Sequence, residues 1–69
     1  MTNMVLEQTV EALESEEHAV RLWRREQFGL LGFDPFVARL LAESPADLGQ
    51  ARTLRRAGCP IDIAFRILA

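Results

Sequence analysis

Three kinds of side chain in this sequence could carry chemistry: one cysteine, one histidine and two sets of arginines. Cys59 stands directly before Pro60, at the head of an apolar segment, a placement that suits a reactive thiol or a haem ligand. His18 lies among glutamates and arginines. Histidine catalysis needs a partner group within hydrogen-bond reach, and one histidine with one cysteine is too few for a structural zinc site. We therefore expect no catalytic residues, no metal site, no cofactor and no enzyme activity.

The arginines form two triads at helical spacing. These are Arg21, Arg24 and Arg25, and Arg52, Arg55 and Arg56. Each triad could bind phosphate groups or an acidic protein surface, because guanidinium groups form paired hydrogen bonds with both. The alternative is a solvated face, supported by an i,i+4 pairing of Glu17 with Arg21. Nucleic-acid-binding proteins usually carry a strong basic excess, whereas this chain has a net charge of −2, so a nucleic acid is the less favoured partner.

These side chains belong to a chain of 69 residues, which is one domain at most. A chain of this size buries only about 60% of its unfolded surface, so its core is small. One cysteine forms no internal disulfide, and stability must come from helix packing or from a partner. No apolar run approaches the about 20 residues that span a bilayer, and the acidic start does not resemble a secretory signal. The expected location is cytoplasmic, without membrane contact.

Charge divides the chain into two parts. Residues 1–17 carry five glutamates and no basic residue, whereas residues 18–69 carry eight arginines against five acidic residues. An apolar stripe of Leu6, Val10 and Leu13 is interrupted at "ESEEHA". We expect an acidic N-terminal helical arm over 1–17 and a compact helical body over 18–69. Ser15 could cap a new helix at this point, and a single helix continuous through Ser15 is the alternative.

Helix-breaking residues divide the body further, and strand patterns are missing from the sequence. Gly32 predicts the end of the first body helix. Asp34 and Pro35 then begin a short helix that reaches about Glu43. The segment 44–47, "SPAD", predicts a third helix that extends to Ala57.

Gly58 and Pro60 predict a fourth helix, with Pro60 in its first position. Its apolar face consists of Ile61, Ala64, Phe65 and Leu68, with Ile63 and Ile67 beside them. A helix of about ten residues is shorter than the about 12 to 15 that are marginal in isolation. We therefore expect this helix to pack against the others or against a second chain.

The body contains an internal repeat with an offset of 26 residues, which aligns "LGFDPFVARLLA" with "AGCPIDIAFRIL". The matched pairs include Phe28 with Leu54, Gly32 with Gly58, Val37 with Ile63, Ala38 with Ala64 and Leu41 with Ile67. Each copy indicates a helix, a glycine turn and a second helix.

The repeat predicts an all-α fold, a small bundle of about four helices built from two helical hairpins over 18–43 and 45–69. The acidic helical arm precedes them. Cys59 matches Phe33, directly after the turn glycine, which favours packing over redox or ligand chemistry for this thiol.

Residues 20–57 resemble the ubiquitin-associated type of three-helix domain. The resemblance rests on "FGLLGF", "DPFVARLLAE" and "ADLGQARTLRRAG", in which a Gly-Phe loop joins the first two helices. In that family the loop and the end of the third helix form a hydrophobic patch that binds a partner protein. The resemblance implies such a role for Gly32, Phe33 and Leu54.

Two weaker resemblances exist. The spacing of Gly32 and Ala38 is similar to the helix-hairpin-helix motif of DNA-binding proteins, but Asp34 and Pro60 stand where that motif needs a second glycine. A carboxylate repels phosphate and a proline has no amide donor. The ending "GCPIDIAFRIL" resembles small helical proteins of actinobacteria and their phages, a likeness that implies no activity.

From these patterns we expect a non-enzymatic protein-interaction module, an adaptor or regulator that binds a bacterial or phage protein. The expected partner-binding residues are Phe33, Phe36, Leu54, Arg52, Arg55 and Arg56. Self-association is compatible with this interpretation. The alternatives are a nucleic-acid-binding protein that uses the arginine triads and a structural subunit of a larger assembly.

Overall fold

The computed structural model describes the backbone of residues 2–69 and the side chains from residue 12 onward. Within that range it contains four helices and no strand: α1 over Thr2–Leu30, α2 over Pro35–Glu43, α3 over Leu48–Arg56 and α4 over Ile61–Leu68. The expected all-α fold is confirmed. No helix in the described range is both long enough and apolar enough to cross a membrane.

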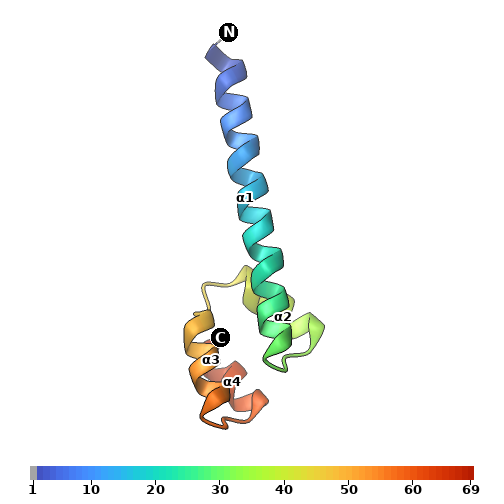
Figure 1. The fold of residues 1–69 in the computed structure, drawn as a ribbon, viewed down its shortest axis with the longest axis vertical. Coiled ribbons are helices and arrows are strands. Elements are labelled where there is room, and N and C mark those ends of the chain that lie inside the picture. Colours follow the sequence, from blue (N-terminus) through green and yellow to red (C-terminus); the bar gives the residue numbers. More distant parts are fainter. Residues whose placement is uncertain (1) are drawn as a thin grey trace.

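Helix α1 is much longer than the rest and gives the molecule an extended shape. Figure 1 shows its N-terminal part projecting from the other three helices, which gather around its C-terminal end. The chain measures 55 by 18 by 16 Å. Its radius of gyration is 15.7 Å, against about 11 Å for a compact chain of this length.

Helix α1 runs through Ser15 without interruption, so a second helix start at this residue does not occur. The segment around it contains no glycine or proline, and a single serine weakens a helix only slightly. The side chains of the expected acidic arm before residue 12, with Leu6 and Val10, lie outside the described part. Every residue from 12 to 23 is exposed to solvent.

The two glycine turns have the same hydrogen-bond pattern. Gly32 and Gly58 have φ angles of 105° and 84°, in the left-handed region. After the first turn the Phe33 N–H donates to the Phe28 carbonyl at 3.3 Å, and 26 residues later the Cys59 N–H donates to the Leu54 carbonyl at 3.0 Å. This six-to-one bond, with an apolar residue after the glycine, is the Schellman helix ending.

The apolar contact that accompanies this helix ending is also present. The rings of Phe28 and Phe33 meet edge to face at 6.0 Å. Cys59 takes the corresponding place in the second turn and packs against the core. The internal repeat therefore describes two equivalent turns, and Cys59 is placed as a small apolar side chain.

The helix starts differ from the predictions by a few residues. Helix α3 begins at Leu48 and ends at Arg56, rather than extending from 44–47 to Ala57. Its N-cap is Asp47, whose Oδ1 accepts from the Gly49 N–H at 2.8 Å. Ser44 instead follows the last residue of α2, where its hydroxyl donates to the Leu41 carbonyl at 2.8 Å.

Prolines and aspartates explain the remaining boundaries. Asp34 is the N-cap of α2, as predicted, and its Oδ1 accepts from the Phe36 N–H at 2.9 Å. Pro60 is the N-cap of α4 rather than its first residue, and it has no side-chain group to accept a hydrogen bond. Helix α4 therefore depends on packing more than α2 does.

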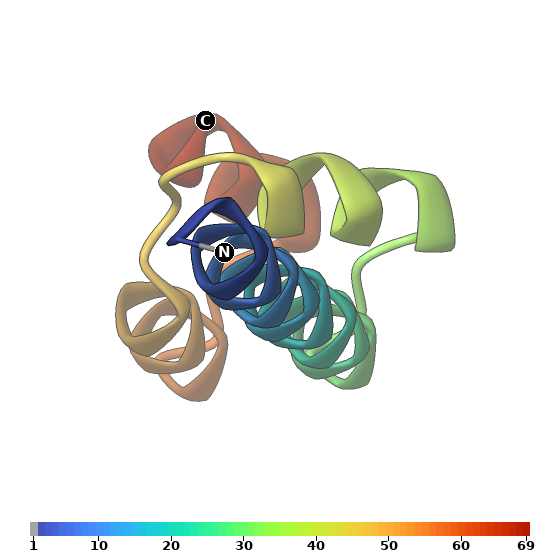
Figure 2. The ribbon, with the colours of Figure 1, turned by 90° about the horizontal axis from the view of Figure 1, so that it is seen from above.

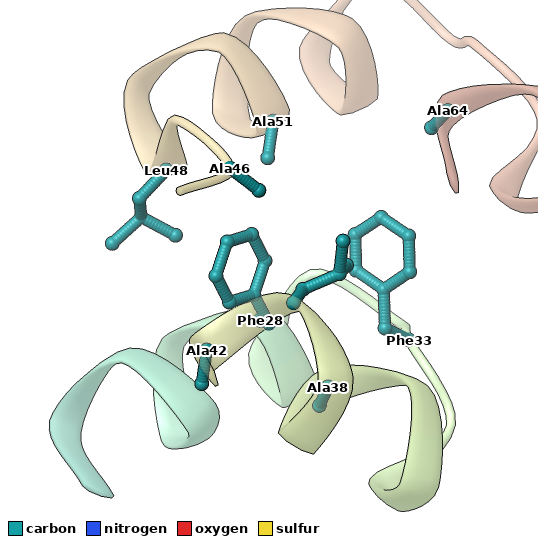
Figure 3. Packing of buried hydrophobic residues seen from close by; sticks show 9 residues of the cluster. Phe28, Phe33, Ala38, Ala42, Ala46, Leu48, Ala51 and Ala64 are labelled. Atoms are coloured by element: carbon teal, nitrogen blue, oxygen red, sulfur yellow. The ribbon is translucent and has the colours of Figure 1, made fainter. Parts of the chain in front are cut away.

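The core is small and rich in alanine. Phe28 and Leu41 are the largest side chains that are fully buried, and three alanines, Ala38, Ala51 and Ala64, have no exposed surface. Figure 3 shows Phe28 between the alanines of α2 and α3. Alanine lets two helices approach closely, and this close approach is why so short a chain can enclose a core.

Helix α4 packs through the face that its sequence predicts. Ala64 is buried, and Ile61, Phe65 and Leu68 pack against the core. The two copies of the repeat differ, however, in how deeply their second helices, α2 and α4, are buried. Ile67 is 49% exposed, whereas its counterpart Leu41 is 1% exposed. Helix α2 packs mainly against α1, and α4 packs mainly against α3. Figure 2 shows α1 between α2 and α3.

Candidate functional site

An apolar groove lies beside the first glycine turn, between α2 and α4. Its volume is about 420 Å³. It is lined by Gly32, Phe33, Asp34, Val37, Ile61, Asp62 and Phe65. The first four residues come from the end of the first turn and the start of α2, and the other three come from the first turns of α4. We call this the turn groove.

Gly32 stands where Arg55 and Ile61 approach the first turn. A Cβ atom at this residue would come within 3.4 Å of Arg55 Nη2 and 3.8 Å of Ile61 Cδ1. The positive φ of 105° adds a backbone reason for glycine. The positive φ angle, more than the space available, therefore explains the glycine at this position.

Arg55 fixes the two glycine turns relative to each other. Its Nε donates to the Leu31 carbonyl at 2.9 Å, and its Nη1 donates to the Cys59 carbonyl at 2.6 Å. Carbonyl groups at helix ends have no partner within the helix, and a guanidinium group satisfies them while also complementing the helix dipole. Arg55 therefore holds α4 beside the first turn and keeps the turn groove in shape.

The turn groove combines an apolar floor with two carboxylates. Asp34 and Asp62 belong to the lining residues, and both are exposed. The Asp34 carboxylate accepts the Phe36 N–H. Among the residues with described side chains, the salt bridge present joins Arg39 and Glu43, so neither aspartate has a cationic partner. The groove thus suits an apolar side chain that is flanked by a basic group.

The six residues expected to bind a partner lie in different environments. Phe33 is 4% exposed and contributes a buried ring to the groove wall. Leu54 packs against the core. Phe36, in contrast, is 65% exposed on the outer surface of α2.

The three arginines of the expected set also differ. Arg55 is engaged with the two turns, as described above. Arg52 Nη2 donates to Gln27 Oε1 at 3.1 Å, and its guanidinium lies 6.0 Å from the centre of the Trp23 ring. Arg56 is exposed. Of the six residues, Phe33 is the member that lines the turn groove. Two of the three arginines on α3, Arg52 and Arg55, make hydrogen bonds within the chain.

The triad on α1 is divided in a similar way. Arg24 donates from Nε to the Ala42 carbonyl at 3.3 Å, and from Nη2 to the Leu41, Ser44 and Ala46 carbonyls at 3.3, 3.2 and 2.6 Å. Its guanidinium also lies 5.4 Å from the centre of the Phe28 ring. Arg24 thus caps the C-terminal end of α2 by donating to its carbonyl groups. Arg21 and Arg25 are exposed.

Sequence reasoning missed most of the groove. The sequence patterns place Ile61 and Phe65 on the packing face of the fourth helix and Asp34 at the start of a helix, and they give Val37 no partner-binding role. The spacing of Ile61 and Phe65, one helical turn apart, indicates a shared face. It does not indicate that this face meets the turn at Gly32, because that contact joins segments almost 30 residues apart.

In the described part of the chain, no group of three histidine, cysteine, aspartate or glutamate side chains is close enough to hold a metal ion. Comparisons with models of known families, with characterised proteins and with solved structures give no match to this chain. The functional assignment therefore depends on the geometry of its surface.

Proposed function

We propose that this protein is a non-enzymatic interaction module, an adaptor or regulator, that binds a segment of a bacterial or phage protein in the turn groove. The observation that supports this is an apolar groove with two unpaired carboxylates on a protein whose core is very small. Its volume of about 420 Å³ lies within the usual range of ligand sites, about 300 to 1,000 Å³. A cytoplasmic location is part of this proposal, because a chain with one cysteine is not stabilised by internal disulfides.

The chemistry of the groove defines the kind of partner segment. An apolar side chain inserted between Val37 and Phe65 removes apolar surface from water, which contributes about 1.5 to 3 kcal/mol for a residue such as leucine or phenylalanine. An arginine or lysine next to it pairs with Asp34 or Asp62. Charge pairs at the edge of an interface contribute mainly to specificity and to the rate of association.

The exposed surface of α2 extends the contact area beyond the groove. Phe36 follows Asp34 and Pro35 and is 65% exposed, and Leu40, one turn later, is 42% exposed. Aromatic residues are common among the side chains that dominate binding energy at protein interfaces. Of the six residues expected from sequence, Phe36 is thus the one best placed to contact a partner directly.

The same geometry disfavours nucleic acid as the partner. Asp34 and Asp62 place negative charge beside the first turn, where it repels phosphate. Arg24 and Arg55 donate to backbone carbonyls, and Arg52 is held against Trp23. A structural role in a larger assembly is the second candidate, because such a role also uses an exposed apolar surface.

The test compares partner capture by three versions of the full chain: the parent, Asp62→Lys and Glu26→Lys. Asp62 and Glu26 are both exposed and make no salt bridge, so the two substitutions make the same charge change on a folded protein. We expect a host protein to be retained by the parent and by Glu26→Lys and lost by Asp62→Lys. NMR titration with that protein should then shift the amide signals of Gly32, Val37 and Ile61. Equal retention by all three chains would place the binding site elsewhere.

A further inference from the structure

A second concave surface lies between α1 and α2 and shares Phe33 with the turn groove. Two adjoining cavities of about 540 and 210 Å³ share Leu22 and Arg25 in their walls. Small residues of the two helices, Gly29, Ala38 and Ala42, widen the space between them. We call this surface the α1/α2 groove.

Gly29 shows that the fold does not fill the α1/α2 groove. A Cβ atom at this residue would meet nothing within 4 Å, and its φ angle is not positive. Glycine inside a helix lowers stability by about 0.5 to 1 kcal/mol relative to alanine. Neither the turn nor the packing of this chain requires a glycine here, in contrast to Gly32.

The smaller cavity of the α1/α2 groove, nearer the N-terminal part of α1, has a basic lining. Arg21, Arg25 and Arg39 line the smaller cavity together with His18 and Glu43. Glu43 pairs with Arg39 at 3.5 Å. Arg21 and Arg25 have no carboxylate partner among the described side chains, and like charges at i,i+4 repel each other along a helix. This part of the groove therefore suits an acidic helix.

The chain itself contains such a helix. Five of the residues from 7 to 17 are glutamates, and this segment contains no basic residue. It belongs to the same continuous helix as Arg21 and Arg25, so it cannot fold back onto the groove of its own chain. Only a second copy can bring the acidic half of α1 against the basic half.

Six of the charged positions on α1 are symmetric about residue 16. Glutamates stand at 7, 11 and 14, and His18, Arg21 and Arg25 stand at the mirrored positions in the opposite order. These six positions follow one another at intervals of three or four, the spacing of a single helix face. Reversing the direction of a second α1 places the glutamates at 7, 11 and 14 opposite basic residues, while Glu16 lies opposite Glu16 and Glu17 opposite Ser15. A parallel copy places all five glutamates opposite glutamates.

We propose that α1 pairs antiparallel with α1 of a second copy about a twofold axis near residue 16, and that the acidic half of each α1 lies along the α1/α2 groove of the other. In this register Glu7 lies opposite Arg25, Glu11 opposite Arg21 and Glu14 opposite His18. Val10 lies opposite Leu22, which is 50% exposed in the single chain.

The twofold arrangement accounts for several features together. A twofold interface is formed by the same surface of both chains, so each contact occurs twice. The repulsion between Arg21 and Arg25 is relieved by the facing glutamates. The exposed residues of α1 from 12 to 23 gain a partner helix. Apart from Phe33, the α1/α2 groove and the turn groove are lined by different residues, so the proposed dimer leaves Val37 and the α4 wall of the turn groove free.

Charge exchange tests this proposal by sedimentation velocity of the full chain at low and high salt. We expect the parent to be a dimer that weakens as salt rises, because exposed charge pairs are screened. Arg25→Glu and Glu7→Arg should each weaken dimer formation at least about tenfold, and the double variant should restore it. Arg66→Glu makes the same charge change as Arg25→Glu at an exposed residue of α4 and should not alter the dimer.

Orientation is tested separately by disulfide trapping in chains that also carry Cys59→Ser. A mixture of Val10→Cys and Leu22→Cys chains should form the mixed disulfide preferentially. Disulfides between identical chains would indicate parallel helices and would overturn the proposal, as would a monomeric parent or a double variant that stays monomeric. Circular dichroism of every variant identifies those that lose helix. Partner binding at the turn groove is measured by capture of a host protein, whereas the dimer is measured by sedimentation and disulfide trapping. The failure of one proposal is therefore distinguishable from the failure of the other.

Discussion

Arg24 Nη2 donates to the carbonyl oxygen of Ala46 at 2.6 Å, and this bond joins α1 to a segment 22 residues later in the chain. The same side chain also reaches the carbonyls of Leu41, Ala42 and Ser44. The carbonyls at the end of α2 lack partners within their own helix, and one guanidinium group satisfies several of them. A charged side chain at the edge of the small core thus defines where α2 ends and how α3 is placed.

Replacement of Arg24 should therefore be costly. Hydrogen bonds to charged groups contribute about 1.5 to 3 kcal/mol, and Arg24→Ala removes such bonds from several carbonyls at once. We expect a loss of at least about 2 kcal/mol in the free energy of unfolding, measured by urea denaturation with circular dichroism. Arg66→Ala, at an exposed residue of α4, is the control and should change stability by less than about 0.5 kcal/mol. Equal effects of the two substitutions would contradict this role.

Much of the architecture can be predicted from the sequence because it depends on local chemistry. Glycines at 32 and 58, aspartates before helices and the 26-residue repeat predict the number of helices and the two equivalent turns. The roles of the arginines cannot be predicted in this way. Arg24 and Arg55 bind carbonyls in segments distant in sequence or in a turn, and their type and spacing are the same as those of a surface triad.

A partial signal for these arginines does exist in the helical spacing. Arg24 stands one turn before the buried Phe28, and Arg55 stands one turn after the buried Ala51. Both lie on the inner face of their helix, whereas Arg25 and Arg56 are exposed in the structure. The turn groove could not be predicted, because it arises from the contact of α4 with the first turn, and local patterns do not specify that contact.

Arg55, like Arg24, joins separate segments through hydrogen bonds to carbonyl groups. It should determine how stably α4 packs beside the first glycine turn. Arg55→Ala removes the bonds to the Leu31 and Cys59 carbonyls, so we expect faster amide hydrogen exchange over Ile61–Leu68 while exchange in α2 changes less. Arg56→Ala, at the next and exposed residue, serves as the control and should leave exchange in α4 unchanged. Uniform acceleration in all helices would show that Arg55 stabilises the whole fold rather than this attachment.

Three phenylalanines provide a graded test of the core. Phe28 is fully buried, Phe65 is partly buried and Phe36 is 65% exposed. Replacing a buried phenylalanine with alanine costs about 3 to 5 kcal/mol, a large part of what a domain of this size can hold. We expect Phe28→Ala to unfold the protein, Phe65→Ala to destabilise it strongly and Phe36→Ala to leave its thermal melting almost unchanged. Loss of stability in Phe36→Ala would indicate that this side chain packs in solution.

The two glycines at the end of α1 should respond to alanine in opposite directions. Gly29 has a helical φ and open space around it, so Gly29→Ala should raise the free energy of unfolding by about 0.5 to 1 kcal/mol. Gly32→Ala should lower it by more than about 1 kcal/mol, because the left-handed conformation disfavours a Cβ and Arg55 lies close by. Urea denaturation of both variants checks this pair. Both variants are measured at high salt and low protein concentration, where the proposed dimer is dissociated, because a second copy would occupy the space around Gly29. A destabilised Gly29→Ala monomer would mean that this space is filled within the single chain.

Removal of residues 1–14 separates the fold from the self-association. Residues 12–23 of α1 are exposed, whereas the contacts that hold α2 and α3 begin at Trp23 and Arg24. We expect the shortened chain to keep α2, α3 and α4, with the cooperative thermal transition of a folded domain in circular dichroism. It should sediment as a monomer, because it lacks the glutamates at 7, 11 and 14 that lie opposite Arg25, Arg21 and His18 of the second copy in the proposed dimer. Unfolding of this chain would show that residues of α1 before Trp23 also stabilise the fold. A shortened chain that still dimerises would place the interface within residues 15–69.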